Sequence, residues 1–175
     1  MHHLMEYFEN DSQIRDILIT GGDALMSQNK SLEKILFAVC DMAERKRKAN
    51  RERPDGQKYA EMQRIRLGTR LPVYLPMRIN DELVEILRRT KEKGTDAGIS
   101  QFIIQTHFQS PLELTPMVLE GIRKLKSAGW SISNPLIGVL IDIQTDASAL
   151  VSLLNLRRAV LDVQVADDGW LAAFA

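Results

Sequence analysis

Four short apolar segments separated by helical patterns constrain the fold of this chain most strongly. The apolar segments span residues 15–20, 64–68, 101–105 and 130–133, and the helical patterns between them span 32–48, 81–93 and 116–128. Strands that alternate with helices form parallel sheets with right-handed crossovers. The sequence therefore predicts an α/β fold through residue 134. The run of Ile17, Leu18 and Ile19 predicts that the first strand is buried.

Residues with special backbone preferences mark the limits of the helices. Ser31, Asn80 and Thr115 each precede a helical pattern, and their side-chain oxygens can accept hydrogen bonds from first-turn N–H groups. We therefore expect each of them to cap a helix. Pro72 and Pro76 lie close together after the second strand, and this spacing predicts a segment without regular structure.

Two segments differ in composition from the alternating core. Residues 44–62 are polar, basic in their first half and interrupted by a Pro-Asp-Gly turn, so we expect a helix end that continues into a charged surface insertion. Residues 135–175 lose the strand–helix alternation, although an apolar run at 136–143 predicts a fifth strand and Asp146 the start of a helix. We expect a core over 1–134 and a divergent tail over 135–175.

The composition restricts the classes of function. The chain has 175 residues, with 23 Lys and Arg against 23 Asp and Glu, so no net charge attracts nucleic acid or an acidic membrane. No apolar run reaches the roughly 18 residues that a transmembrane helix requires. Cys40 is the single cysteine and lies on the apolar stripe of its helix, so we interpret it as a small buried hydrophobe. We expect a reducing, cytoplasmic location.

Polar and glycine residues gather where the strands end, which is the edge at which parallel sheets bind ligands. These residues are Thr20, Gly21, Gly22 and Asp23, then Gly68 to Arg70, Thr106 to His107, and Ser133 to Asn134. Glycines at such a place allow backbone N–H and C=O groups to reach a ligand directly. The carboxylate of Asp23 suits a cationic group such as an ammonium, and alternatively it caps the segment that follows.

The remaining polar side chains at this edge have two interpretations each. His107 can donate to a carboxylate or hydroxyl of a ligand, or can form a structural hydrogen bond. Arg66, Arg70 and Arg78 can bind a carboxylate or phosphate through the guanidinium fork, or can pair with an acid at the edge of the core. The chain contains no GxGxxG motif, no P-loop and no GxSxG elbow, which argues against the nucleotide-binding and hydrolase sites that use them.

Four motifs in order carry a resemblance to a known family. The runs IRDILITGGDAL, RIRLGTRLPVYLPMRI, QTHFQSPLELT and AGWSISN resemble the lysine 2,3-aminomutase family of radical S-adenosylmethionine enzymes. The resemblance implies a partial (β/α) barrel, open on one side, with about four to five parallel strands and helices outside. It also implies an isomerase lineage that moves an amino group along an amino acid, although the substrate-reading residues lie outside the matching motifs.

The family uses three cofactors: S-adenosylmethionine, a [4Fe-4S] cluster held by a CxxxCxxC motif, and pyridoxal phosphate held by a lysine. The resemblance implies that Thr20, Gly21, Gly22 and Asp23 contact the methionine amino group. It implies that His107 and Asn134 line the S-adenosylmethionine pocket, and that Arg70 lies near the same pocket. A small-molecule ligand is therefore the expected partner.

The chain departs from the family in motifs that the chemistry requires. It contains no CxxxCxxC motif, its match ends at Pro135, and neither the glycine-rich segment nor the pyridoxal phosphate lysine follows. We therefore assign no catalytic residue and no metal ligand, and we expect a fragment or degenerate relative that is inactive as this chain alone. Two alternatives remain: a cluster-free module that binds S-adenosylmethionine or an amino acid, and an interaction protein that completes its barrel with another chain. Exposed barrel edges would also permit self-association.

Overall fold

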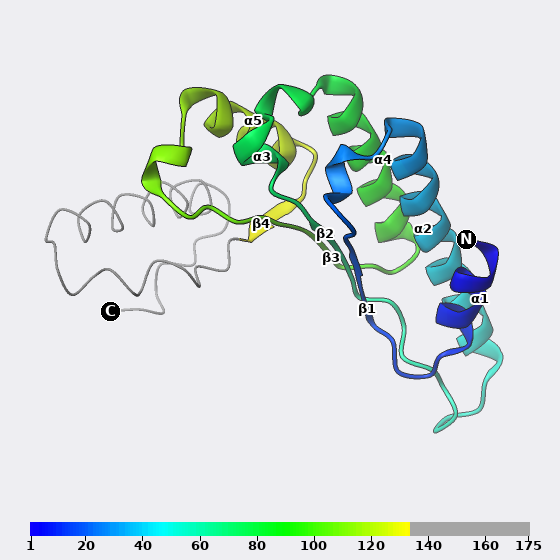
Figure 1. Cartoon of the computed structure of the whole chain (residues 1–175). Helices are drawn as coiled ribbons and strands as arrows, with labels where there is room; N and C mark the ends of the chain where they lie inside the picture. The colour runs from blue at the N-terminus through cyan, green and yellow to red at the C-terminus, as the bar shows by residue number, and fades with distance from the viewer. Residues whose placement is uncertain (134–175) are drawn as a thin grey trace, which may run out of the picture.

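An open, all-parallel sheet with helices packed against it organises the chain (Figure 1). The computed structural model describes residues 1–133. The strands are β1 (Asp16–Ile19), β2 (Arg64–Gly68), β3 (Gln101–Gln105) and β4 (Ser131–Ser133), hydrogen-bonded in that order. In the register, Asp16 lies beside Arg64, and Arg64 lies beside Gln101. The four expected strands and the α/β class are confirmed, and within these residues the sheet does not close into a barrel.

The helices pack against one face of this sheet. They are α1 (His2–Asn10), α2 (Asn29–Glu52), the single-turn α3 (Leu71–Tyr74), α4 (Asp81–Asp96) and α5 (Pro116–Ser127). Alternate strand residues are buried beneath them, namely Ile17, Ile65, Leu67, Phe102, Ile104 and Ile132. The opposite face is partly exposed to solvent. Leu18 is 42% exposed there, so the expectation that the whole first strand is buried is wrong.

Two of the three expected helix caps are confirmed. The Asn80 side chain accepts a hydrogen bond from the Leu83 N–H at 2.9 Å, and the Thr115 hydroxyl accepts one from the Val118 N–H at 3.3 Å. Ser31 is not a cap, because α2 begins two residues earlier, at Asn29.

A tertiary contact is made at the start of α2. The guanidinium of Arg78 donates hydrogen bonds to the Ser27 carbonyl at 2.9 Å and to the Asn29 side chain at 2.5 Å. This arginine lies about fifty residues further along the chain and contacts the start of the helix. Because a guanidinium only donates, the first-turn N–H groups of α2 have no side-chain cap.

The segment with two prolines has regular structure, contrary to the expectation from the sequence. Pro72 lies in the first turn of α3, and Pro76 begins a 3-10 turn that ends at Arg78. A proline in the first turn removes only an N–H that has no partner within the helix. The two prolines therefore start short helical turns.

The charged segment 44–62 takes part in the core through several of its residues. α2 continues through it to Glu52, and the side chains of Lys46, Asn50 and Met62 are buried. The Asn50 amide donates to the Tyr59 carbonyl at 2.7 Å, and its oxygen accepts from the Tyr59 N–H at 2.9 Å. The remainder of the segment is mostly exposed.

The expected fifth strand and final helix, and Asn134, lie outside the described residues. α1 was not expected from the sequence, and its carboxyl end is joined to α2 by the buried Lys46. No helix in the described part of the chain is long and apolar enough to cross a membrane.

Candidate functional site

A cleft of about 750 Å³ opens at the carboxyl ends of β1, β2 and β3. Its lining residues come from three strand ends and from α3: Leu18, Thr20, Gly22, Asp23, Met26, Gly68, Thr69, Arg70, Leu71, Tyr74, Leu75, Gln105 and His107. Because the strands are parallel, their carboxyl ends meet at one edge of the sheet. The fold thus brings Thr20, Gly22, Asp23, Arg70 and His107 together. Their contact with a ligand stays a prediction.

Of the two glycines after β1, Gly22 lines this cleft and Gly21 directly precedes it. Gly21 has a φ of +116° and Gly22 a φ of +65°, conformations that side chains other than glycine rarely adopt. A Cβ atom built at either position would meet nothing within 4 Å. The backbone conformation therefore requires glycine here, and the space beside it is free for a ligand to approach the main chain.

Asp23 is hydrogen-bonded to its own chain. It caps the 3-10 turn Ala24–Met26, where its Oδ1 accepts from the Leu25 N–H at 3.0 Å. The same oxygen accepts from the Thr69 hydroxyl at 2.5 Å, and Oδ2 accepts from the Arg70 N–H at 2.6 Å. The structure thus shows the capping interpretation of this carboxylate.

Arg70 forms one wall of the cleft. Its Nη2 lies 3.5 Å from Oε1 of Glu113, and its guanidinium carbon lies 4.5 Å from the centre of the Tyr74 ring. Its Nε is buried and has no hydrogen-bond partner in the described structure.

The other two arginines of this stretch, Arg66 and Arg78, form hydrogen bonds within the chain. Arg66 lies on the exposed face of the sheet, where its Nε donates to Asp16 Oδ1 at 2.9 Å. Arg78 donates to Ser27 and Asn29 at the start of α2, and its Nη1 is buried without a hydrogen-bond partner in the described structure. Arg66 and Arg70 therefore follow the interpretation in which arginine pairs with an acid, whereas neither of these partners of Arg78 is an acid.

His107 lines the cleft and is half-buried. Its ring forms no hydrogen bond with any of residues 1–133, so both ring nitrogens remain available. Its neighbour Thr106 is buried on the core side of the chain and does not line the cleft. Of the two residues after β3, His107 is therefore the one that lines the cleft.

Some lining residues were not predicted from the sequence. Met26, Tyr74 and Leu75 are exposed apolar side chains that form part of the cleft wall. Tyr74 and Leu75 follow Pro72 in the segment expected to be irregular, so no periodic pattern indicated where they would lie. The sequence predicted Gln105 as part of a strand and not as a site residue. Gln105 is the last residue of β3, and this position at the strand end could have indicated that it lies beside the cleft.

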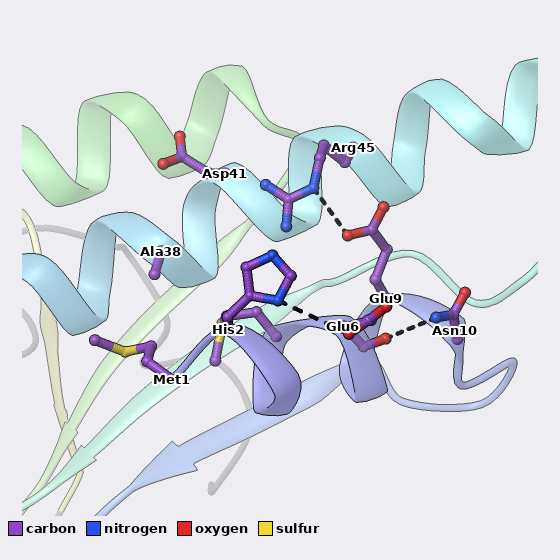
Figure 2. A pocket seen from close by; sticks show the side chains of 9 residues that line it. Met1, His2, Glu6, Glu9, Asn10, Ala38, Asp41 and Arg45 are labelled. Carbon is purple, nitrogen blue, oxygen red and sulfur yellow. Dashed lines mark hydrogen bonds and ion pairs between the residues drawn. The ribbon is translucent and has the colours of Figure 1, made fainter.

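A second, smaller pocket of about 430 Å³ lies between α1 and α2 (Figure 2). Its lining mixes apolar residues such as Met5 and Ala38 with charged ones, and Arg45 Nε donates to Glu9 Oε2 at 2.8 Å across it. His2, His3 and Glu6 hold potential metal-ligand atoms within 4.8 Å of one another, but all three side chains are exposed on a single helix. We assign no function to this pocket.

The residues of this chain do not fit an iron–sulfur cluster or anchored pyridoxal phosphate. Cys40 is the only cysteine of the sequence and is buried in α2 with its Sγ 3.7 Å from the Thr90 carbonyl oxygen. Burial raises the pKa of its thiol to about 12, so the thiolate that binds metal is disfavoured. No lysine is among the described residues that line the cleft.

Comparison with known proteins finds aminomutases, and no family model matches the chain. The L-lysine 2,3-aminomutase of Methanococcus maripaludis is 30% identical over 130 residues, which cover 74% of this chain and 24% of that protein. The L-lysine 2,3-aminomutase of Bacillus subtilis is 32% identical over 149 residues, 85% of this chain and 26% of that protein. The glutamate 2,3-aminomutase of Clostridioides difficile is 32% identical over 130 residues, 74% and 25% respectively. The chain spans about a quarter of the length of these curated relatives.

Proposed function

Because the chain belongs to the lysine 2,3-aminomutase family, we propose that its cleft binds S-adenosylmethionine as the adenosyl-binding part of an aminomutase-like isomerase. The observation that carries this proposal is that Gly22 lines one cleft with Arg70 and His107, and that a Cβ atom at Gly22 or at the adjacent Gly21 would meet nothing within 4 Å. An amino acid ligand needs hydrogen-bond acceptors for its ammonium and donors for its carboxylate, and this cleft offers both.

Each group of the ligand has a suitable partner in the cleft. The main-chain carbonyls around Gly21 and Gly22 can accept from the ammonium, and the guanidinium of Arg70 in the cleft wall can donate to the carboxylate. The ring of His107 can hydrogen-bond a ribose hydroxyl. The apolar side chains of Leu18 and Met26 supply a surface for the purine ring.

We further propose that this chain alone does not catalyse the isomerisation. When bound, S-adenosylmethionine supplies the family with the adenosyl group that abstracts hydrogen, and the role of this chain is to bind and orient it. No set of cysteines and no cleft lysine in residues 1–133 fits the other two cofactors. Incubation with iron, sulfide, reductant, pyridoxal phosphate, S-adenosylmethionine and either lysine or glutamate should therefore yield no β-amino acid by NMR. Formation of such a product would refute this part of the proposal.

Calorimetric titration tests the binding proposal. We expect S-adenosylmethionine to release measurable heat at millimolar concentration, and Gly22→Val to abolish the signal because it fills the open floor and strains the backbone. Arg70→Gln should weaken binding by about tenfold, the loss of one charge-assisted hydrogen bond. Arg88→Gln, on the exposed side of α4 and paired with Glu85, is the matched control and should bind as the native chain does. Absence of heat from the native chain would refute the proposal.

A second candidate function rests on the open sheet. β1 is one edge of the sheet among the described residues, and Leu18 is exposed on the face away from the helices. An exposed edge strand favours pairing with another chain, and we propose a second copy of this chain as the partner. Light scattering coupled to size exclusion should then show a dimer. A monomer at all concentrations would count against this candidate.

A further inference from the structure

The carboxylate of Asp23 joins two strand ends that are far apart in the sequence. It follows β1, whereas two of its three donors, Thr69 and Arg70, follow β2. The Thr69 hydroxyl accepts from the Leu71 N–H at 3.0 Å, so its single proton is free to point at Asp23. Thr69 is only 6% exposed, which keeps water from competing for this bond.

We propose that Asp23 is a positioning residue: it holds the end of β2 against the glycine pair and thereby sets the direction of Arg70 in the cleft. The part of this inference that concerns a ligand rests on the function proposed above. It replaces the expectation that the Asp23 carboxylate serves as the counter-ion of the ligand's ammonium.

The arithmetic of hydrogen bonds supports this assignment. A carboxylate offers about four lone-pair positions. Three are occupied by the N–H groups of Leu25 and Arg70 and by the Thr69 hydroxyl, at distances between 2.5 and 3.0 Å. Two of the three donors are main-chain groups whose positions define the shape of the two strand ends. An ammonium in the cleft therefore has at most one position left on Asp23, whereas a Cβ atom at Gly22 would meet nothing within 4 Å, so the backbone there is open to approach.

The same interactions continue from Arg70 to the segment after β3. The Arg70 main chain is held by Asp23, and its guanidinium reaches Glu113 across the face of Tyr74. Oε2 of Glu113 in turn accepts from the Gln109 N–H at 2.8 Å. Asp23 thus stands at one end of a chain of contacts that links the ends of all three strands bordering the cleft. Loss of its carboxylate should release Arg70 from one of its two anchors.

A double-mutant cycle between Asp23→Asn and Thr69→Val tests the inference. The affinity for S-adenosylmethionine should fall about fivefold or more in each single variant, and the double variant should be no weaker than the weaker single one. Thr69→Ser keeps the hydroxyl and should bind as the native chain does. A counter-ion role predicts a different pattern: Asp23→Asn weakens binding, Thr69→Val does not, and the two effects add.

A ligand without the amino group separates the two roles directly. We expect Asp23→Asn to weaken binding of S-adenosylmethionine and of its analogue lacking the α-amino group by the same factor, because Asp23 acts through Arg70. A loss seen only with the amino-bearing ligand would overturn the inference.

The melting temperatures of the same variants test the contact without any ligand. The losses caused by Asp23→Asn and Thr69→Val should be less than additive in the double variant, since both act on the hydrogen bond between the two side chains. Thr69→Val also removes the acceptor of the Leu71 N–H. If the native chain binds no S-adenosylmethionine, the proposed function fails, whereas this readout still decides whether Asp23 joins the strand ends. Fully additive losses would refute the link.

Discussion

Replacing Lys46 by methionine should destabilise the chain by about 2–3 kcal/mol. The ammonium of Lys46 has three N–H donors, and each meets a main-chain carbonyl: Asp11 at 2.7 Å, Phe8 at 3.2 Å and Ile14 at 3.2 Å. These carbonyls lie at the end of α1 and just after it, where helix geometry leaves C=O groups without partners. The side chain is 0% exposed, so water does not replace it in the native fold.

The magnitude follows from the carbonyls that methionine leaves behind. A buried polar group without a partner costs about 1–3 kcal/mol, and the short bond to Asp11 supports one full cost of this size. The two longer bonds add less, because their carbonyls can turn toward water when the end of α1 loosens. Removal of a desolvated ammonium offsets part of the loss. Burial is the main cause that lowers the pKa of Lys46, and it outweighs the attraction to Asp11.

Urea unfolding followed by circular dichroism measures the effect. Lys48→Met is the matched control, because Lys48 lies on the same helix, is exposed and pairs only with Glu44; it should change stability by less than about 0.5 kcal/mol. A loss from Lys46→Met no greater than that of the control would refute the reasoning.

The pH dependence gives a second readout for Lys46. Its pKa is lower in the folded chain than its ordinary value of 10.5, so between the two values the unfolded chain binds more protons. Stability should rise with pH across that window in the native chain, and this contribution should disappear in Lys46→Met.

Two further predictions concern the core. Native Cys40 should not react with a thiol reagent at pH 8 and should react fully in urea, because the side chain is buried and its thiol pKa is raised from 9.0 to about 12. Rapid labelling of the native chain would contradict the burial. Between pH 9 and about 12 the unfolded chain releases the thiol proton and the folded chain keeps it, so this group lowers the stability of the fold as pH rises. Gly94→Ala should cost about 1–3 kcal/mol in the same urea assay, because its Cβ would lie 2.6 Å from Cζ of Phe102, whose ring packs edge-on against Trp130. Thr95→Ala, exposed on the same helix, should change stability by less than about 0.5 kcal/mol, and equal effects of the two substitutions would rule out the close packing.

Features that depend on neighbouring residues were readable from the sequence. The four strands and the parallel order of the sheet followed from the alternation of apolar and helical segments. Asn80 and Thr115 cap their helices because a cap acts within three residues of itself. The glycine pair after β1 predicted an accessible backbone at the strand end, and both glycines have positive φ values, which only glycine adopts readily. Each of these signals is local, so the order of the residues is sufficient to predict it.

The partner of each polar side chain was decided only by the tertiary structure. Ser31 is not a cap because α2 begins earlier, at Asn29. The Asn29 side chain accepts a hydrogen bond from Arg78, which follows β2 in the sequence. Lys46, within a run that looked fully solvated, became buried because the end of α1 places three carbonyls around it.

The cleft follows the same division between local and tertiary information. The sequence alone placed Asp23 beside the glycine pair, but it did not indicate that Thr69 and Arg70 would occupy its carboxylate. A carboxylate binds whichever donors the fold brings to it, and donors 46 and 47 residues away become neighbours only when β1 and β2 pair.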